Sequence, residues 1–109
     1  MKHNQTMEQT MESIFDMRRV WDKYWAECQH LHRRARATDR STTLWEVLMD
    51  KAIIQLDLID NARPHFTALL DKVHAANQEV YTEHKQWMDN IWTDCLNQRH
   101  KLREERKAS

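Results

Sequence analysis

The sequence predicts an all-α protein, a three-helix antiparallel bundle with long first and third helices, and three observations support this fold class. The 109 residues include no glycine and one proline, whereas sheets depend on turns that are rich in both. Apolar residues recur at steps of three and four along most of the chain, which is the period of an amphipathic helix. Breaks in this pattern are few, so the connections are short and 1–109 forms one domain.

The first helix is predicted over about 7–39. Thr6 and Gln9 have the spacing of a capping box, in which each side chain bonds the other residue's backbone N–H. Arginines fill the last turns, where positive charge suits the helix dipole. One apolar stripe faces the core. Its members are Met7, Met11, Ile14, Met17, Trp21, Tyr24, Trp25, Cys28, Leu31 and Ala35.

The central helix is predicted to begin with a second capping box, Thr43 and Glu46, and to end in a tight reversal over 61–64, because Pro64 suits the first turn of a following helix. It carries two apolar stripes on nearly opposite sides, and such a helix is normally covered on both. The main stripe is Trp45, Leu48, Met49, Ala52, Leu56 and Ile59. The smaller stripe is Val47, Ile54 and Leu58.

The third helix is predicted to run from Pro64 to about residue 106. Its main apolar face is Phe66, Leu69, Leu70, Val73, Ala76, Val80, Trp87, Ile91, Cys95 and Leu102. A second stripe appears after Tyr81, at Met88, Trp92 and Leu96.

These lengths predict that the first and third helices extend past the central one by about 21 and 36 Å. Exposed apolar surface of that size marks an interface. We therefore expect a homodimer in which each overhang packs on the other subunit. Two alternatives remain open: a break at Ala75–Gln78 that folds the chain back as a fourth helix, or a different protein partner.

The predicted function is binding, by a small stand-alone helical module such as an adaptor, an assembly factor or a steric inhibitor of a larger complex. Tryptophan and methionine are common anchors at protein interfaces. The sequence gives no reason to expect a cofactor, a catalytic set or a membrane span, and we expect a cytoplasmic protein that is not an enzyme. The predicted interface residues are Trp87, Met88, Ile91, Trp92, Leu96, Val47, Ile54 and Leu58.

Nucleic-acid binding by a helical dimer is the alternative function. Basic residues gather at the ends of the first and third helices, which point to the same pole of an up-down-up bundle, and a basic pole can hold phosphates. Against this, the 17 basic residues are balanced by 17 acidic ones, so no global field attracts a polyanion. The candidate contacts are Arg33, Arg34, Arg36, Arg40, Arg99, Lys101 and Arg103.

Two pairs, Glu27/His30 and Asp71/His74, have the spacing of carboxylate-bridged metal sites in helical bundles. Neither pair faces inward on the predicted helices, so solvated side chains are the favoured interpretation and no metal is expected.

His32 and His84 interrupt apolar stripes. A hydrogen-bonded core histidine is the favoured interpretation, and a pH-sensitive interface is the alternative because imidazole titrates near neutral pH. Cys28 and Cys95 fall on apolar faces, where thiols pack as small inert hydrophobic groups.

Overall fold

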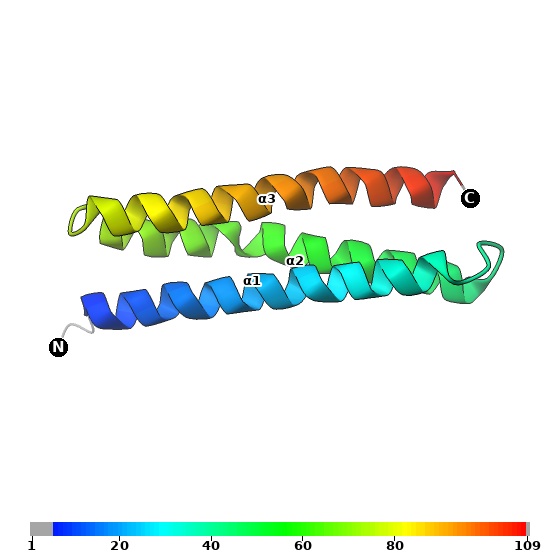
Figure 1. Ribbon diagram of the computed structural model, residues 1–109, viewed down its shortest axis with the longest axis horizontal. Helices are drawn as coiled ribbons and strands as arrows, with labels where there is room; N and C mark the ends of the chain where they lie inside the picture. Colours follow the sequence, from blue (N-terminus) through cyan, green and yellow to red (C-terminus); the bar gives the residue numbers. More distant parts are fainter. Residues whose placement is uncertain (1–5, 109) are drawn as a thin grey trace.

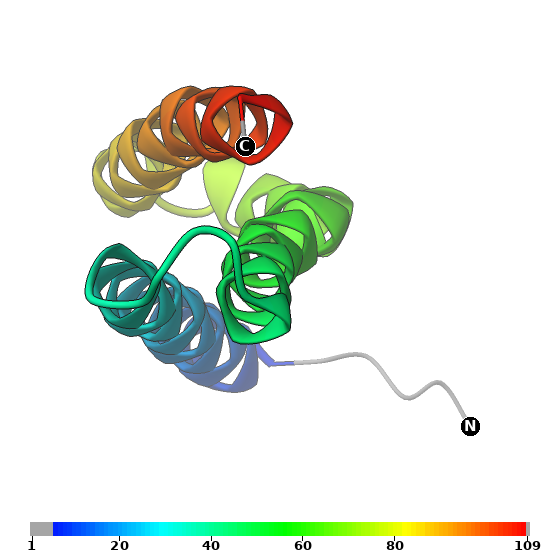
Figure 2. The ribbon, with the colours of Figure 1, turned by 90° about the vertical axis from the view of Figure 1, so that its right-hand side faces the viewer.

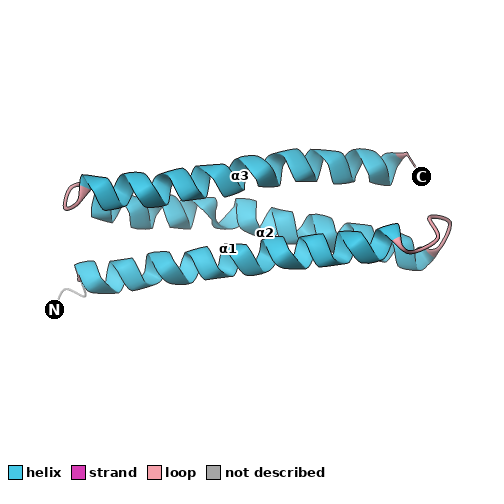
Figure 3. Ribbon diagram, viewed as in Figure 1, coloured by secondary structure: helices cyan, strands magenta, loops and turns pink. Residues whose placement is uncertain are grey.

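The computed structural model describes residues 6–108, which form an antiparallel bundle of three helices and contain no strand. The helices are α1 (Met7–Arg36), α2 (Thr43–His74) and α3 (Gln78–Lys107), and they contain 30, 32 and 30 residues. They lie side by side along the 57 Å length of the molecule, joined by two short turns (Figures 1 and 3). The predicted all-α fold class is confirmed.

The helix starts follow local capping signals, with one correction. Thr6 and Gln9 form the predicted capping box, because Thr6 accepts from the Gln9 N–H at 3.1 Å and Gln9 Oε1 accepts from the Thr6 N–H at 2.9 Å. The box predicted at Thr43 is wrong. Thr42 caps α2 instead, by accepting from the Trp45 N–H at 3.2 Å, and Thr43 is the first helical residue.

The reversal predicted at 61–64 does not occur, because α2 continues through Pro64 to His74. Proline inside a helix costs about 3 kcal/mol, since its ring cannot donate to the preceding turn. Burying one large apolar side chain is worth about 1.5–3 kcal/mol, so the several that follow Pro64 outweigh this cost. The buried residues after Pro64 are Phe66, Leu69, Leu70 and Val73.

The second turn lies at 75–77 instead. Asn77 is the N-cap of α3, with an extended backbone, and its side-chain oxygen accepts from the Val80 N–H at 3.1 Å. The chain therefore does break within Ala75–Gln78, but it forms three helices and not four. Because the helices are nearly equal in length, the overhangs predicted from the shorter central helix do not exist.

The core is built around α2, which packs closely against both α1 and α3. Viewed along the bundle, α1 and α3 approach each other less closely than either approaches α2 (Figure 2). Trp21, Phe66 and Trp87 supply one aromatic ring from each helix, with Trp21 5.1 Å from Phe66 and 6.4 Å from Trp87 between ring centroids. The main stripe predicted for the central helix is confirmed as core: Trp45, Leu48, Met49, Ala52, Leu56 and Ile59 are all buried.

Candidate interaction surface

Large apolar side chains are exposed on α1 and α2 only, within the described part of the chain. The most exposed are Leu44 and Ile54, at 52% and 51% of their full surface. The α3 helix presents no such residue among those described. Within residues 6–108 these side chains are Met7, Phe15 and Val20 on α1, with Leu44, Val47, Ile54 and Leu58 on α2.

An open groove between α1 and α2 joins part of this set into one surface. The groove has a volume of about 390 Å³ and is lined by apolar and polar residues of both helices. The surface formed by this groove together with the exposed apolar residues of α2 is called the outer α1/α2 face below. The groove residues are Ser13, Asp16, Met17, Val20 and Tyr24 of α1, with Leu58, Ala62 and His65 of α2.

The smaller stripe predicted for the central helix lies on this outer α1/α2 face. Val47, Ile54 and Leu58 remain exposed at 40%, 51% and 37%. The sequence-based prediction did not include Leu44 and Val20. Leu44 could have been predicted from the sequence, because it lies three residues before Val47 and therefore on the same side of the helix. Val20 could not, because its place beside α2 depends on how the two helices pack.

The predicted interface residues of α3 have partners inside the chain. Met88 is 2% exposed, and the others are half-buried: Trp87, Ile91, Trp92 and Leu96. Arg18 stacks on the Trp87 ring at 4.5 Å. Trp92 donates its indole N–H to Asp60 at 3.0 Å. The prediction that these residues lie on a projecting overhang is therefore wrong, because α2 runs alongside α3 over nearly its whole length.

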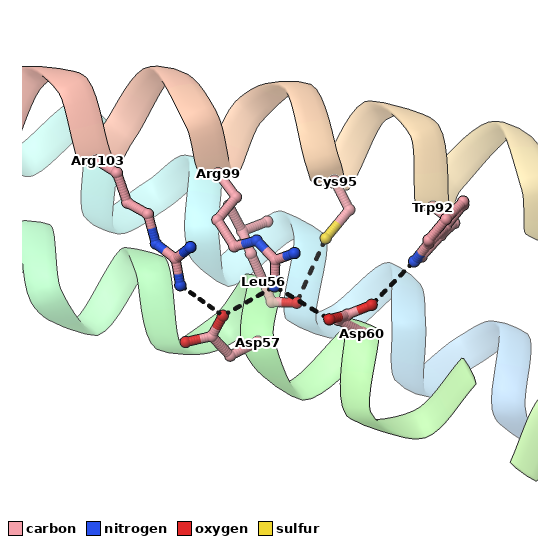
Figure 4. A network of polar contacts seen from close by, with 7 residues as sticks. All are labelled: Leu56, Asp57, Asp60, Trp92, Cys95, Arg99 and Arg103. Carbon is pink, nitrogen blue, oxygen red and sulfur yellow. Dashed lines mark hydrogen bonds and ion pairs between the residues drawn. The ribbon is translucent and has the colours of Figure 1, made fainter. Parts of the chain in front are cut away.

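A polar network joins α2 to the middle of α3 (Figure 4). Arg99 donates to both Asp57 and Asp60 at 3.1 Å, and Arg103 lies 3.6 Å from Asp57. The pKa of Asp60 is lowered, first by the hydrogen bond from Trp92 and then by Arg99. These charges link the two helices, and the bonds of Arg99 engage it more firmly than the single, longer contact engages Arg103, whose side chain is 54% exposed.

The basic pole lies where α1 and α3 both end (Figure 1). Arg40 donates to the Glu105 carbonyl at 3.1 Å and stacks on Trp45 at 5.2 Å. Arg106 pairs with Asp50 at 3.1 Å, near the start of α2. The acids of α2 thus neutralise the arginines of α3 at this pole, Arg99, Arg103 and Arg106. Four of the predicted nucleic-acid contacts are exposed and form no ion pair among the described residues: Arg33, Arg34, Arg36 and Lys101.

Both predicted seam histidines lie between α1 and α3. The ring of His32 lies 3.1 Å from Glu105 through Nε2 and 3.4 Å from the Gln98 amide through Nδ1. His84 is 2% exposed, and its Nδ1 lies 3.0 Å from Arg18 Nη1. Because guanidinium is always a donor, this contact requires an unprotonated Nδ1 on His84.

Replacing His84 with glutamine is expected to reduce the loss of stability below neutral pH. The pKa of His84 is lowered, first by burial and then by Arg18, while Glu83 acts in the opposite direction. Stability from the neutral ring is therefore full above the ordinary pKa of about 6.5 and is lost as pH falls toward the lowered value. Glutamine keeps an acceptor for Arg18 and does not titrate.

The measurement is the free energy of unfolding in urea between pH 7 and pH 5. We expect the wild type to lose more stability than His84→Gln over this range. The other histidines contribute equally to both proteins and cancel in the comparison. Equal losses would contradict the assignment of a depressed pKa to His84.

The remaining candidates for chemistry show no assembled site. Glu27 and His30 are exposed, as are Asp71 and His74. No group of three or more metal-binding side chains comes together within residues 6–108.

The two cysteines are free and fully buried. Burial, followed by the charge of the other thiol, raises the pKa of Cys28 to about 12. Burial raises that of Cys95 to about 11. Thiols in this state are poor nucleophiles.

Comparison with known proteins gave no match to a family model, a curated protein or a solved structure. None of the helices in the described chain has both the length and the apolar character needed to span a membrane. The fold and the outer α1/α2 face are therefore the basis for assigning a function.

Proposed function

We propose that this chain is a helical protein–protein interaction module that binds through its outer α1/α2 face. The observation that carries the proposal is the one-sided distribution of exposed apolar side chains. Val20 and Leu58 line one groove and Ile54 lies one helical turn before Leu58, whereas α3 presents no large exposed apolar residue among those described. Exposed apolar side chains do not stabilise a monomer, and contiguous apolar surface commonly marks a binding site.

The binding mode would be steric, with a rigid two-helix surface as the docking platform. Arg99 of α3 bridges two acids of α2, and aromatic rings of all three helices pack together in the core. These contacts fix α1 and α2 relative to α3 and so keep the docking surface rigid. An adaptor, an assembly factor or an inhibitor would use such a surface without a cofactor. The proposal includes a cytoplasmic location, because two free buried thiols suit a reducing compartment.

Nucleic-acid binding by the basic pole is less well supported. Arg99 and Arg103 are engaged with Asp57, and Arg40 is held by a backbone carbonyl and an indole ring. Phosphate binding depends on the number of available cations, and each cation already paired within the chain adds little.

The test adds charge to the proposed face without touching the core. Ile54→Asp combined with Leu58→Asp should leave the chain folded with a modest loss of thermal stability, because the two side chains are 51% and 37% exposed. Thr93→Asp combined with Asn97→Asp is the matched control, since it adds the same charge to exposed positions on α3.

Tagged wild type and both variants are used to capture proteins from an extract of the native host. We expect at least one protein, which can be an untagged copy of this chain, to be retained by the wild type and the control and lost with the face variant. Identical sets of retained proteins for all three would refute the proposed function.

A further inference from the structure

We infer that the occupant of the outer α1/α2 face is a second copy of this chain, with the two α2 helices antiparallel about a two-fold axis between Lys51 and Ile54. This inference rests on the proposed function and names its partner. It begins from the spacing of the exposed side chains on α2, which alternates between three and four residues. The stripe is Leu44, Val47, Lys51, Ile54, Leu58 and Asn61.

This spacing is the heptad pattern by which one helix packs along another. The apolar members of the stripe are already exposed in the described chain, so nothing has to unfold to make the contact. The stripe also maps onto itself when a second copy is reversed. Leu44 then faces Asn61, Val47 faces Leu58, and Lys51 faces Ile54. Val47 with Leu58 is the layer in which apolar side chains face each other, and it recurs on both sides of the axis, as a two-fold symmetric dimer requires.

Charge decides between the two possible directions. Lys51 forms no ion pair within the described chain. A parallel pair in register would place Lys51 against Lys51 of the other copy, and two like charges at one seam position repel. In the antiparallel pair, Lys51 faces Ile54 of the second copy. Asp50 and Asp57 of that copy lie within one helical turn of its Ile54.

Those carboxylates are accessible, since the side chains of Asp50 and Asp57 are 55% and 37% exposed. The antiparallel pair also brings Asp50 toward Asp57 of the second copy. Asp57 pairs with Arg99 and Arg103, and Asp50 pairs with Arg106, all within one chain, and these pairs weaken the repulsion between like charges as well as the attraction to Lys51. The antiparallel direction is therefore favoured mainly because it separates the two lysines, and the exposed sides of Asp50 and Asp57 add a smaller attraction.

The available area suits a modest dimer. The stripe and the neighbouring groove span about 20 residues, or about 30 Å of helix, and two helices side by side are about 20 Å wide. Each copy can therefore cover about 600 Å², for a total of about 1,200 Å², which is the lower end for a specific interface. We accordingly expect association at micromolar rather than nanomolar concentration.

The test combines sedimentation equilibrium with cysteine cross-linking of the full chain. The wild type should sediment with twice the chain mass at about 100 µM, and Ile54→Asp combined with Leu58→Asp should sediment as a monomer. Lys51→Glu should weaken the dimer at least tenfold, whereas Lys51→Ala should weaken it less, because only glutamate adds repulsion from Asp50 and Asp57.

Cross-linking tests the direction of packing. A mixture of Val47→Cys and Leu58→Cys chains should form a mixed disulfide dimer under mild oxidation, because these positions face each other. Neither variant alone should cross-link, since equivalent residues lie about 16 Å apart along the antiparallel helices, beyond the reach of a disulfide. The native thiols are fully buried and do not interfere.

Each outcome is decisive. Cross-linking of the single variants but not of the mixture would overturn the antiparallel arrangement. A wild type that stays monomeric at about 1 mM would overturn the second copy as the occupant. The proposed function would survive that result if the face variant still lost a protein captured from the host, and it would fail if capture were unchanged.

Discussion

Trp21→Ala is expected to lower the free energy of unfolding by about 3–5 kcal/mol, the largest effect of any single substitution considered for this chain. Trp21 is 0% exposed and lies where all three helices meet, against Phe66 of α2 and Trp87 of α3. Removing the indole leaves a cavity that rigid helices cannot close. Urea unfolding followed by circular dichroism measures the loss.

Two further variants control this prediction. Phe15→Ala removes another aromatic ring, but Phe15 is 46% exposed, so its cost should stay below about 1 kcal/mol. Trp21→Phe should cost less than Trp21→Ala, because phenylalanine fills part of the space and eliminates a buried indole N–H that has no hydrogen-bond partner. Similar losses for Trp21→Ala and Phe15→Ala would show that the assignment of the core is wrong.

Arg99→Ala is expected to cost about 2–3 kcal/mol at neutral pH, the second largest effect. Arg99 is 18% exposed and bonds both Asp57 and Asp60. Its loss leaves two neighbouring carboxylates on α2 without their shared partner, and hydrogen bonds between charged groups are worth about 1.5–3 kcal/mol each before screening. The loss should shrink as pH falls through the lowered pKa of Asp60, and urea unfolding at pH 7 and at pH values below the ordinary range of aspartate measures this change.

Arg103→Ala is the matched control for the network. Its side chain is 54% exposed and lies 3.6 Å from Asp57, so its removal should cost no more than about 1 kcal/mol. Equal costs for the two arginines would show that the network contributes through general charge balance and not through the two bonds of Arg99.

Features with strong local causes could be predicted from the sequence. The absence of glycine predicted helices, and Thr6 with Gln9 predicted the start of α1 because both partners of that cap lie within one turn. The core face of α2 was predictable through Ile59, because periodicity alone identifies which side of a helix is apolar. The exposed positions Val47, Ile54 and Leu58 were likewise recognised as a separate stripe.

The end of α2 could not be predicted, because two signals compete there. Pro64 is a local signal for a helix boundary, whereas Phe66 and the buried residues after it favour continuation. The energy that decides between them comes from burial against the other helices, and this is not visible in the local pattern. The error then propagated, because the overhang that exposed Trp87 and Trp92 followed from the shortened helix.

The sequence by itself determined that this protein is helical, where α1 begins and which faces of its helices are apolar, because these properties depend on residues a few positions apart. Only the tertiary structure decided which apolar face stays uncovered. Trp92 reaches Asp60, and Trp87 packs with Trp21 and Phe66, because equal helix lengths place them side by side. The same packing leaves Ile54 about half exposed, since a bundle of three helices covers α2 on only two sides.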